Sequence, residues 1–561
     1  MFLVKQVTLI TNSLHDLYNL HFIALDCKYD GLDLSSCHNI KHIDLRKQVT
    51  LTPNSLLNLH NLEFITLYCK YDRLDLSSCP NLKHINLFKH VTLTPNSLPD
   101  LHNLEYISLY CKYDRLDLSS CPNLKHINLF KHVTLTPNSL PDLHNLEYIS
   151  LYCKYDGLDL SSCRNIKHID LDEHVTLTPI SLPDLHNLEY ISLYCKYDGL
   201  DLSSCRNIKH IDLDEHVTLT PNSLRDLRNL EYIELFCKYD GLDLTACHNL
   251  KHIDLRVQVT LIPNSLHGFF NLEFITLCCK YDALDLSSCH KLKEMFLVKQ
   301  VTLITNSLHD LYNLHFITLD CKYDGLDLSS CHNIKHIDLR EQLTLTPNSL
   351  RDLHNLEFIK LYCKYDGLDL SSCRNIKHID LDEHVTLTPN SLPDLHNLEY
   401  ISLYCKYDGL DLSSCRNIKH IDLDEHVTLT PNSLPDLHNL EYISLYCKYD
   451  GLDLSACHNL MHIALAEHVT MTPNSLRDLL NLEFISLYCK YDGLDLSSCR
   501  NIKHIDLDEH VALTPNSLRD LRNLEYIELF CKYDGLDLSA CHNLNHIDLV
   551  LYTRRAKISK M

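Results

Sequence analysis

Residues 175–216 read VTLTPISLPDLHNLEYISLYCKYDGLDLSSCRNIKHIDLDEH, and a closely similar stretch recurs every 42 residues along most of the chain. Thirteen such repeats fill residues 7–552 without an insertion. A fixed period of this kind is typical of a repeat architecture, in which each repeat packs mainly against its two neighbours. The 561 residues are therefore expected to form one solenoid rather than several globular domains.

A longer period shows how the array arose. Residues 1–46 reappear almost unchanged at residues 295–340, an offset of 294 residues or seven repeats. The array therefore grew by tandem duplication of blocks.

Each repeat divides into two coils of 20 and 22 residues. The phrase LxxIxL at residues 188–193 returns as IxxIxL at residues 208–213, and earlier apolar positions in each coil lie three residues apart. Coils this short leave little room for an α-helix and favour a turn-like segment that leads into a short strand. The sequence predicts 26 coils, with one strand from each coil stacked in a parallel sheet.

The full pattern, LxxLxxLxxIxL, resembles that of the leucine-rich-repeat family over nearly the whole chain. The phrase CPNLKHINL at residues 79–87 is similar to those of the cysteine-containing and bacterial surface-type subclasses, although Lys196 and His216 stand where the family usually has Asn or Cys. Asn187 and Asn207 instead precede the strands, so the subclass stays open. The resemblance implies a mostly β, right-handed superhelix with a parallel β-sheet on its inner face and short strands or 3-10 turns on its outer face.

The outer face has a signal of its own. Residues 175–177 (VTL) and 200–202 (LDL) alternate with period two, which predicts a second set of short strands. A turn is expected between the sets at residues 197–199, where the triplet Tyr-Asp-Gly stands.

The two ends of the array lack recognisable caps. The solenoid domain, residues 1–552, begins in mid-coil, and a short basic tail follows at residues 553–561. Because solenoids usually need polar terminal caps, we expect either a fragment of a longer protein or an unusual free-standing array.

The composition of the chain limits the classes of partner and the cellular compartment that we expect. The formal charge of -23 disfavours nucleic acid and anionic membranes and favours a neutral or basic protein partner. No signal peptide or transmembrane segment is visible, and the 27 cysteines are spread evenly along the chain, so a cytoplasmic, reduced protein is expected.

The cysteines fall almost entirely into two columns, represented by Cys195 and Cys205. Both columns continue the apolar pattern of the coil and are expected in the core, with metal or redox use as the open alternative. Cys278 is the one extra cysteine; it replaces an outward tyrosine and is expected to be exposed.

The outward positions of the inner sheet form the candidate partner-binding surface. Aromatic rings and histidines alternate along one row, with aspartates in the row beside them. Aromatic rings interleaved with polar groups suit protein recognition, whereas the alternative is that the rings only stabilise the sheet. The candidate residues are Tyr106, His126, Tyr148, His168, Asp170, Tyr190, Tyr194, His210, Asp212, Tyr232, His378, Asp380, Tyr400, His420, Asp422 and Tyr442.

Three further features have both a functional and a structural interpretation. His210 and Asp212 share a strand face, so they could bind a metal ion, although we do not favour this interpretation. Protonation of the histidines between pH 5 and 7 could also make partner binding depend on pH. The row of Glu189 and Lys209 is interpreted as structural charge pairing. The triplet at residues 196–198, Lys-Tyr-Asp, recurs thirteen times and is interpreted as a turn rather than a contact motif.

Catalysis is not expected. The sequence contains no phosphate-binding loop and no zinc-protease motif, and thirteen near-copies of every group do not make one preorganised pocket. We expect no cofactor, metal or small-molecule substrate. The sequence favours a non-enzymatic scaffold that binds a protein along its inner face. The alternative is the ligand-sensing array of a larger intracellular receptor, similar to nucleotide-binding leucine-rich-repeat immune receptors.

Overall fold

The computed structural model describes the backbone of residues 2–3 and, in full, residues 19–549, apart from short gaps. These gaps are residues 58, 95–96, 99–100, 141–142, 179–181, 183–184, 299, 305–306, 309–310, 390, 393–394, 432, 435–436, 474, 477–478, 516, 520, 532 and 534–537. The predicted basic tail lies outside the described residues. Strands and turns make up the described part of the chain, which contains no helix that could cross a membrane.

The chain divides into two compact units. Unit 1 comprises residues 1–272 and 276–281, and unit 2 comprises residues 273–275 and 282–561. Strands β26 (Phe274–Leu277) and β27 (Tyr281–Leu284) fall at the division, and β29 (Val301–Leu303) follows in unit 2.

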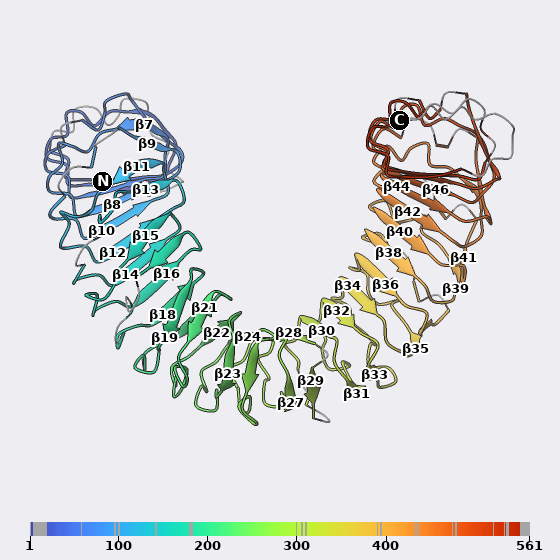
Figure 1. Ribbon diagram of the computed structural model, residues 1–561, viewed down its shortest axis with the longest axis horizontal. Helices are drawn as coiled ribbons and strands as arrows, with labels where there is room; N and C mark the ends of the chain where they lie inside the picture. Colours follow the sequence, from blue (N-terminus) through green and yellow to red (C-terminus); the bar gives the residue numbers. More distant parts are fainter. Residues whose placement is uncertain are drawn as a thin grey trace. The chain divides into compact units, whose positions relative to one another are not determined.

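Within unit 1 the inner strands stack as one parallel ladder, each belonging to one coil (Figure 1). Tyr190 of one strand stands opposite His210 of the next, and the apolar positions match in the same register. The strands are β1 (Phe2–Leu3), β2 (Phe22–Leu25), β4 (His42–Leu45), β6 (Phe64–Leu67), β8 (His84–Leu87), β10 (Tyr106–Leu109), β12 (His126–Leu129), β14 (Tyr148–Leu151), β16 (His168–Leu171), β18 (Tyr190–Leu193), β20 (His210–Leu213), β22 (Tyr232–Leu235) and β24 (His252–Leu255).

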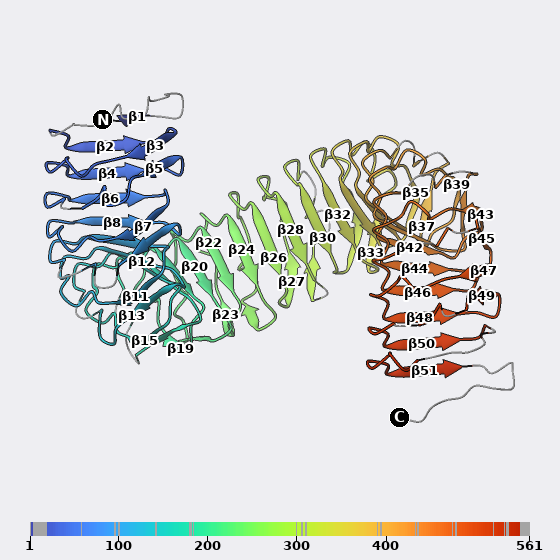
Figure 2. The same cartoon turned by 90° about the horizontal axis from the view of Figure 1, so that it is seen from above.

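Unit 2 repeats the arrangement. Its last inner strands all point the same way in Figure 2, as expected of a parallel sheet. Its inner strands are β28 (Glu294–Leu297), β30 (Phe316–Leu319), β32 (His336–Leu339), β34 (Phe358–Leu361), β36 (His378–Leu381), β38 (Tyr400–Leu403), β40 (His420–Leu423), β42 (Tyr442–Leu445), β44 (His462–Leu465), β46 (Phe484–Leu487), β48 (His504–Leu507), β50 (Tyr526–Leu529) and β51 (His546–Leu549). The predicted parallel sheet with one strand per coil is confirmed.

The core follows from the alternation of side chains along each strand. Ile191 and Leu193 point inward and are fully buried, as are Leu188 and Cys195 on either side of them. Burying a side chain of this size contributes about 1.5–3 kcal/mol, and every coil supplies several. The core is therefore a set of apolar columns, each filled by the same position of successive coils.

Both cysteine columns belong to this core, as predicted. All of the described cysteines except Cys278 are buried. Burial raises the pKa of Cys195 to about 11, so this thiol stays protonated at neutral pH. Cys278 is partly exposed, as expected, but the guanidinium of Arg256 covers it at 3.9 Å from Sγ.

The predicted second set of strands is confirmed, and it forms separate two-stranded pairs. In unit 1 they are β3 (Tyr29–Leu32) with β5 (Val49–Leu51), β7 (Tyr71–Leu74) with β9 (Val91–Leu93), β11 (Tyr113–Leu116) with β13 (Val133–Leu135), β15 (Tyr155–Leu158) with β17 (Val175–Leu177), β19 (Tyr197–Leu200) with β21 (Val217–Leu219), and β23 (Tyr239–Leu242) with β25 (Val259–Leu261). In unit 2 they are β31 (Tyr323–Leu326) with β33 (Leu343–Leu345), β35 (Tyr365–Leu368) with β37 (Val385–Leu387), β39 (Tyr407–Leu410) with β41 (Val427–Leu429), β43 (Tyr449–Leu452) with β45 (Val469–Met471), and β47 (Tyr491–Leu494) with β49 (Val511–Leu513).

One detail of the outer face was predicted wrongly. The strand covers residues 197–200 rather than 200–202, so the Tyr-Asp-Gly triplet is strand and not turn. Gly199 has a φ of 76° and makes a bulge, at which its N–H donates to the hydroxyl of Thr218 at 2.8 Å. Tyr197 is buried, and its hydroxyl accepts the N–H of Leu182 at 3.3 Å. A buried tyrosine with a structural hydrogen bond is thus what the repeated triplet provides.

The asparagine that precedes nearly every inner strand ties its coil to the preceding one; before β28, Lys291 stands in its place. The side-chain amide of Asn187 donates to the carbonyl of Arg164 at 3.2 Å, and that of Asn207 donates to the carbonyl of His186 at 3.3 Å. The unusual position of the asparagine is therefore explained by hydrogen bonds between coils.

Candidate protein-binding face

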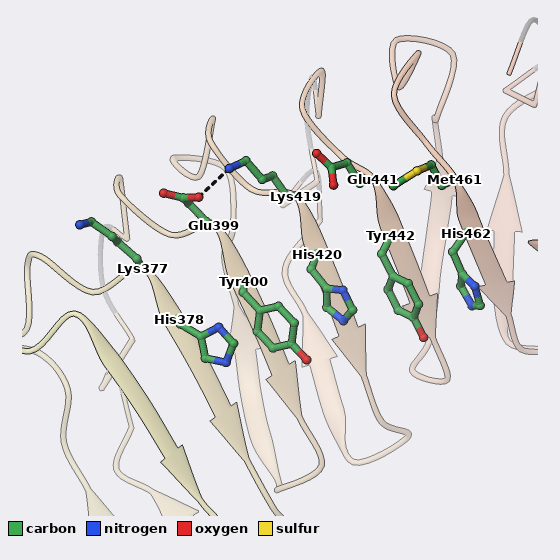
Figure 3. Close-up of a pocket in the computed structure, with 10 residues that line it drawn as sticks. All are labelled: Lys377, His378, Glu399, Tyr400, Lys419, His420, Glu441, Tyr442, Met461 and His462. Atoms are coloured by element: carbon green, nitrogen blue, oxygen red, sulfur yellow. Dashed lines mark hydrogen bonds and ion pairs between the residues drawn. The ribbon is translucent and has the colours of Figure 1, made fainter. Parts of the chain in front are cut away.

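A single file of stacked rings runs along the inner sheet of each unit; we call it the ring row. The ring centroids of His378 and Tyr400 lie 3.9 Å apart with an interplanar angle of 8°, and those of Tyr400 and His420 lie 4.1 Å apart at 14°. Figure 3 shows these rings side by side on neighbouring strands. Because each ring covers the faces of its neighbours, the row presents ring edges and hydroxyl groups to solvent, while Nε2 of His168 and of His378 is buried.

Stacking also sets the charge of the histidines. Burial between two rings lowers the pKa of His210 to about 4, and it does the same for His168 and His420. These imidazoles therefore stay neutral down to about pH 5, each with one donor and one acceptor nitrogen. The expected protonation between pH 5 and 7 is wrong for these positions.

The aspartate row is less exposed than the sequence suggested. Asp212 is 8% exposed and Asp380 is 3% exposed. The hydroxyl of Tyr194 donates to Asp212 Oδ2 at 2.8 Å, and that of Ser192 donates to the same atom at 3.3 Å. The long tyrosine leans over the short carboxylate of the next strand, which removes it from solvent.

This arrangement changes the acidity of the row. Burial raises the pKa of Asp170 and Asp212, although hydrogen bonds from the tyrosine and serine oppose that rise. The aspartates are therefore internal acceptors that fix the tyrosines, and the hydroxyl-bearing rings form the outer layer of the face.

The charged row along the edge of the sheet is confirmed as ion pairing. Lys209 Nζ lies 2.7 Å from Glu189 Oε2, and Lys419 Nζ lies 2.7 Å from Glu399 Oε2. Both partners are about half exposed, so solvent screens each pair and it contributes little to stability. The row contributes mainly a pattern of alternating charge beside the ring row.

All of the predicted site residues lie on this face, in two groups. Unit 1 brings together Tyr106, His126, Tyr148, His168, Asp170, Tyr190, Tyr194, His210, Asp212 and Tyr232. Unit 2 brings together His378, Asp380, Tyr400, His420, Asp422 and Tyr442. Over the described residues, no three His, Cys, Asp or Glu side chains gather in a way that could hold a metal ion.

A shallow groove follows the ring row and the charged row of unit 2. It has a volume of about 540 Å³ and extends from Lys377 and His378 to Met461 and His462 (Figure 3). Sequence reasoning missed its far end, because Met461 is a departure from the repeat. A column-by-column comparison of the repeats would have found it, since Lys occupies the same column in the preceding repeat, at Lys419.

Comparison with known proteins shows that solved leucine-rich-repeat structures share the fold of this chain. The sequence matches no protein-family profile and no curated protein. Among solved structures, it is similar to the LRR ectodomain of the Arabidopsis thaliana membrane receptor kinase GASSHO1/SCHENGEN3 in complex with CASPARIAN STRIP INTEGRITY FACTOR 2. The TM-score is 0.61 at 18% identity, with 91% of this chain and 79% of that chain covered.

Two further structures are similar. The plant peptide hormone receptor RGFR1 in complex with RGF2 gives a TM-score of 0.56 at 19% identity, with 95% of this chain and 96% of that chain covered. The Arabidopsis receptor kinase HAESA in complex with the peptide hormone IDA and the co-receptor SERK1 gives 0.55 at 17% identity, with coverage of 87% and 86%. At these identities the likeness establishes the fold.

Proposed function

We propose that this solenoid, which has the fold of leucine-rich-repeat proteins, is a non-enzymatic intracellular scaffold that holds an extended protein segment on its inner face. The observation that carries this proposal is the ring row, which runs unbroken from Phe22 to His252 in unit 1 and from Phe316 to His546 in unit 2, beside hydrogen-bonded polar side chains. The three similar structures are complexes with peptide or protein ligands, which is consistent with such a role.

The orientation of the rings favours a polypeptide over other ligands. The faces of Tyr400, His420 and Tyr442 are covered by their neighbours, so neither a nucleobase nor a sugar ring can stack on them. Aromatic edges carry partial positive charge, and together with tyrosine hydroxyls they suit the carbonyl oxygens of an extended chain. The formal charge of -23 also favours a partner with basic residues.

The proposal is tested with the full chain as bait and with partners quantified by mass spectrometry. Replacing Tyr400, His420 and Tyr442 by Ser removes three consecutive rings and is expected to abolish recovery of partners that bind the inner face. The matched control replaces Lys406 and Asp408, which are exposed on the outer face, by Ser.

The control variant should retain the same partners, and circular dichroism should show that both variants keep their β content. Recovery of the same partners by the ring variant and the control would overturn the proposal.

A further inference from the structure

The charged row of unit 2 is interrupted at the coil that carries β44. Lys419 pairs with Glu399 on the preceding strand, but the position that should serve Glu441 is occupied by Met461. The Met461 side chain is 40% exposed. Within the described part of the chain, no ion pair joins Glu441 to another residue, and Figure 3 shows its carboxylate on the side of Lys419, turned away from Met461. Glu441 is thus left without the cation that its counterpart has.

The same coil also lacks both aspartates of the inner face. Ala464 stands where the preceding repeat has Asp422, and Ala466 stands where it has Asp424. The hydroxyl of Tyr404 donates to Asp422 at 2.7 Å, whereas Tyr446 has no such acceptor. Tyr446 is accordingly more exposed, at 48%.

These replacements create a local change in surface chemistry; we call Met461, Ala464 and Ala466 the apolar window. One cation and two anions are lost together, while the ring row continues unbroken through Tyr442, His462 and Phe484. The carboxylates of Asp422 and Asp506 still stand on either side of the window, each two coils from Ala464. The window is therefore an uncharged spot within an acidic face, at the end of the groove already described.

We propose that the apolar window anchors a basic, extended peptide segment, with an apolar side chain seated over Met461 and Ala464 and a Lys or Arg of the partner paired with Glu441. This inference rests on the proposed function of the inner face and deepens it. It names where on unit 2 a partner is held and which side chains it must carry.

Three physical points select this occupant. Seating an apolar side chain over carboxylates such as those of Asp422 and Asp424 would desolvate them further, and Ala464 and Ala466 remove that cost. Met461 is flexible and polarisable, so it adapts to different apolar groups. Glu441 and the flanking aspartates repel nucleic acid and anionic lipid but attract a basic side chain.

The test uses peptides of nine residues displayed on phage and selected on the full chain. Soluble variant protein with Met461→Lys, Ala464→Asp and Ala466→Asp serves as the competitor. That variant reproduces the preceding repeat at all three positions, and the residues between them, His462, Ile463 and Leu465, are the same in both repeats, so it is expected to fold. Selected peptides should combine Leu, Met or Phe with a nearby Lys or Arg, and they should bind the variant at least tenfold more weakly by fluorescence anisotropy.

A mirrored variant provides the matched control. Lys419→Met, Asp422→Ala and Asp424→Ala create a second window beside Glu399, and the number of peptides bound per chain should rise from one to two. Glu441→Gln should weaken peptides that contain Lys but leave the same peptides with norleucine at that position unchanged.

The outcomes separate the two levels of the proposal. Peptides that bind the wild type and the window variant equally, but lose affinity for the ring variant, would overturn the anchor and leave the inner face as the binding surface. Peptides that bind equally to the wild type, the window variant and the ring variant would overturn both.

Discussion

The repeats that carry β12 and β16 share a backbone and a ring row, yet they present different polar surfaces. Residues 91–132 contain four Lys or Arg and four Asp or Glu, whereas residues 133–174 contain three and seven. On β12 the outward polar residue is Asn128, followed by Phe130; on β16 it is Asp170, followed by Asp172. Adjacent repeats of nearly identical sequence therefore differ most in the chemistry of the inner face.

The difference also changes what the neighbouring tyrosine does. Tyr110 stacks on Phe130 with ring centroids 3.9 Å apart, and it leaves Asn128 without a hydrogen bond to its buried Oδ1. Tyr152 instead donates its hydroxyl to Asp170 at 2.6 Å. Because side chains alternate between core and surface along a strand, the polar rows can vary while the core stays the same.

The largest expected effect tests whether the two repeats truly share a core. Ile127→Ala and Ile169→Ala each remove a fully buried side chain, so each should lower the free energy of unfolding by about 2–5 kcal/mol. The two losses should agree, because the same columns surround both residues. Urea unfolding followed by tyrosine fluorescence measures them, since the chain has no tryptophan. A loss at one site only would show that the polar rows influence the core.

Most of this core could be predicted from the sequence, and the reason is geometric. The period of two along each strand placed Ile191, Leu193 and Cys195 inside, and the structure buries all three. The outer strand was misplaced because the left-handed conformation of Gly199 shifts the register, and a glycine in sequence does not reveal which conformation it adopts.

The sequence predicted where the candidate site lies, but not how buried or how acidic its side chains are. The residues on the inner face were correct, but the burial of Asp212 depends on the direction in which Tyr194 leans, and the pKa of His210 depends on the closeness of two rings. Such side-chain packing is not encoded by spacing alone. Met461 was visible in the sequence, but only a comparison of single columns exposes it, because the repeats otherwise look alike.

A smaller effect on stability is expected when Asn128 of β12 is replaced by the aspartate that β16 has at this position. Asn128→Asp places a carboxyl group where Tyr110 does not donate to it, so ionisation should cost about 1–3 kcal/mol of stability at pH 7.5. Burial raises the pKa of this carboxyl above its unfolded value, as it does for Asp170. The folded state then binds more protons than the unfolded state, and stability is lost as pH rises through the folded pKa.

Urea unfolding of this variant and the wild type at pH 7.5 and at pH 4 measures the effect. The deficit should shrink at pH 4, where the carboxyl is protonated. An equal deficit at both pH values would contradict an electrostatic origin and point to a change in packing instead.

The smallest effect is expected from the two tyrosine hydroxyls. Tyr152→Phe removes the short bond to Asp170, which keeps only the weaker donor Ser150 at 3.2 Å, so stability should fall by about 0.5–1.5 kcal/mol. Tyr110→Phe keeps its stack on Phe130 and should be nearly neutral. The bond from Tyr152 opposes the effect of burial on the pKa of Asp170, so its removal should raise that pKa further. Carboxyl-carbon NMR titration would detect this shift, and an unchanged Asp170 titration would mean that Tyr152 leans over the carboxylate without stabilising its charge.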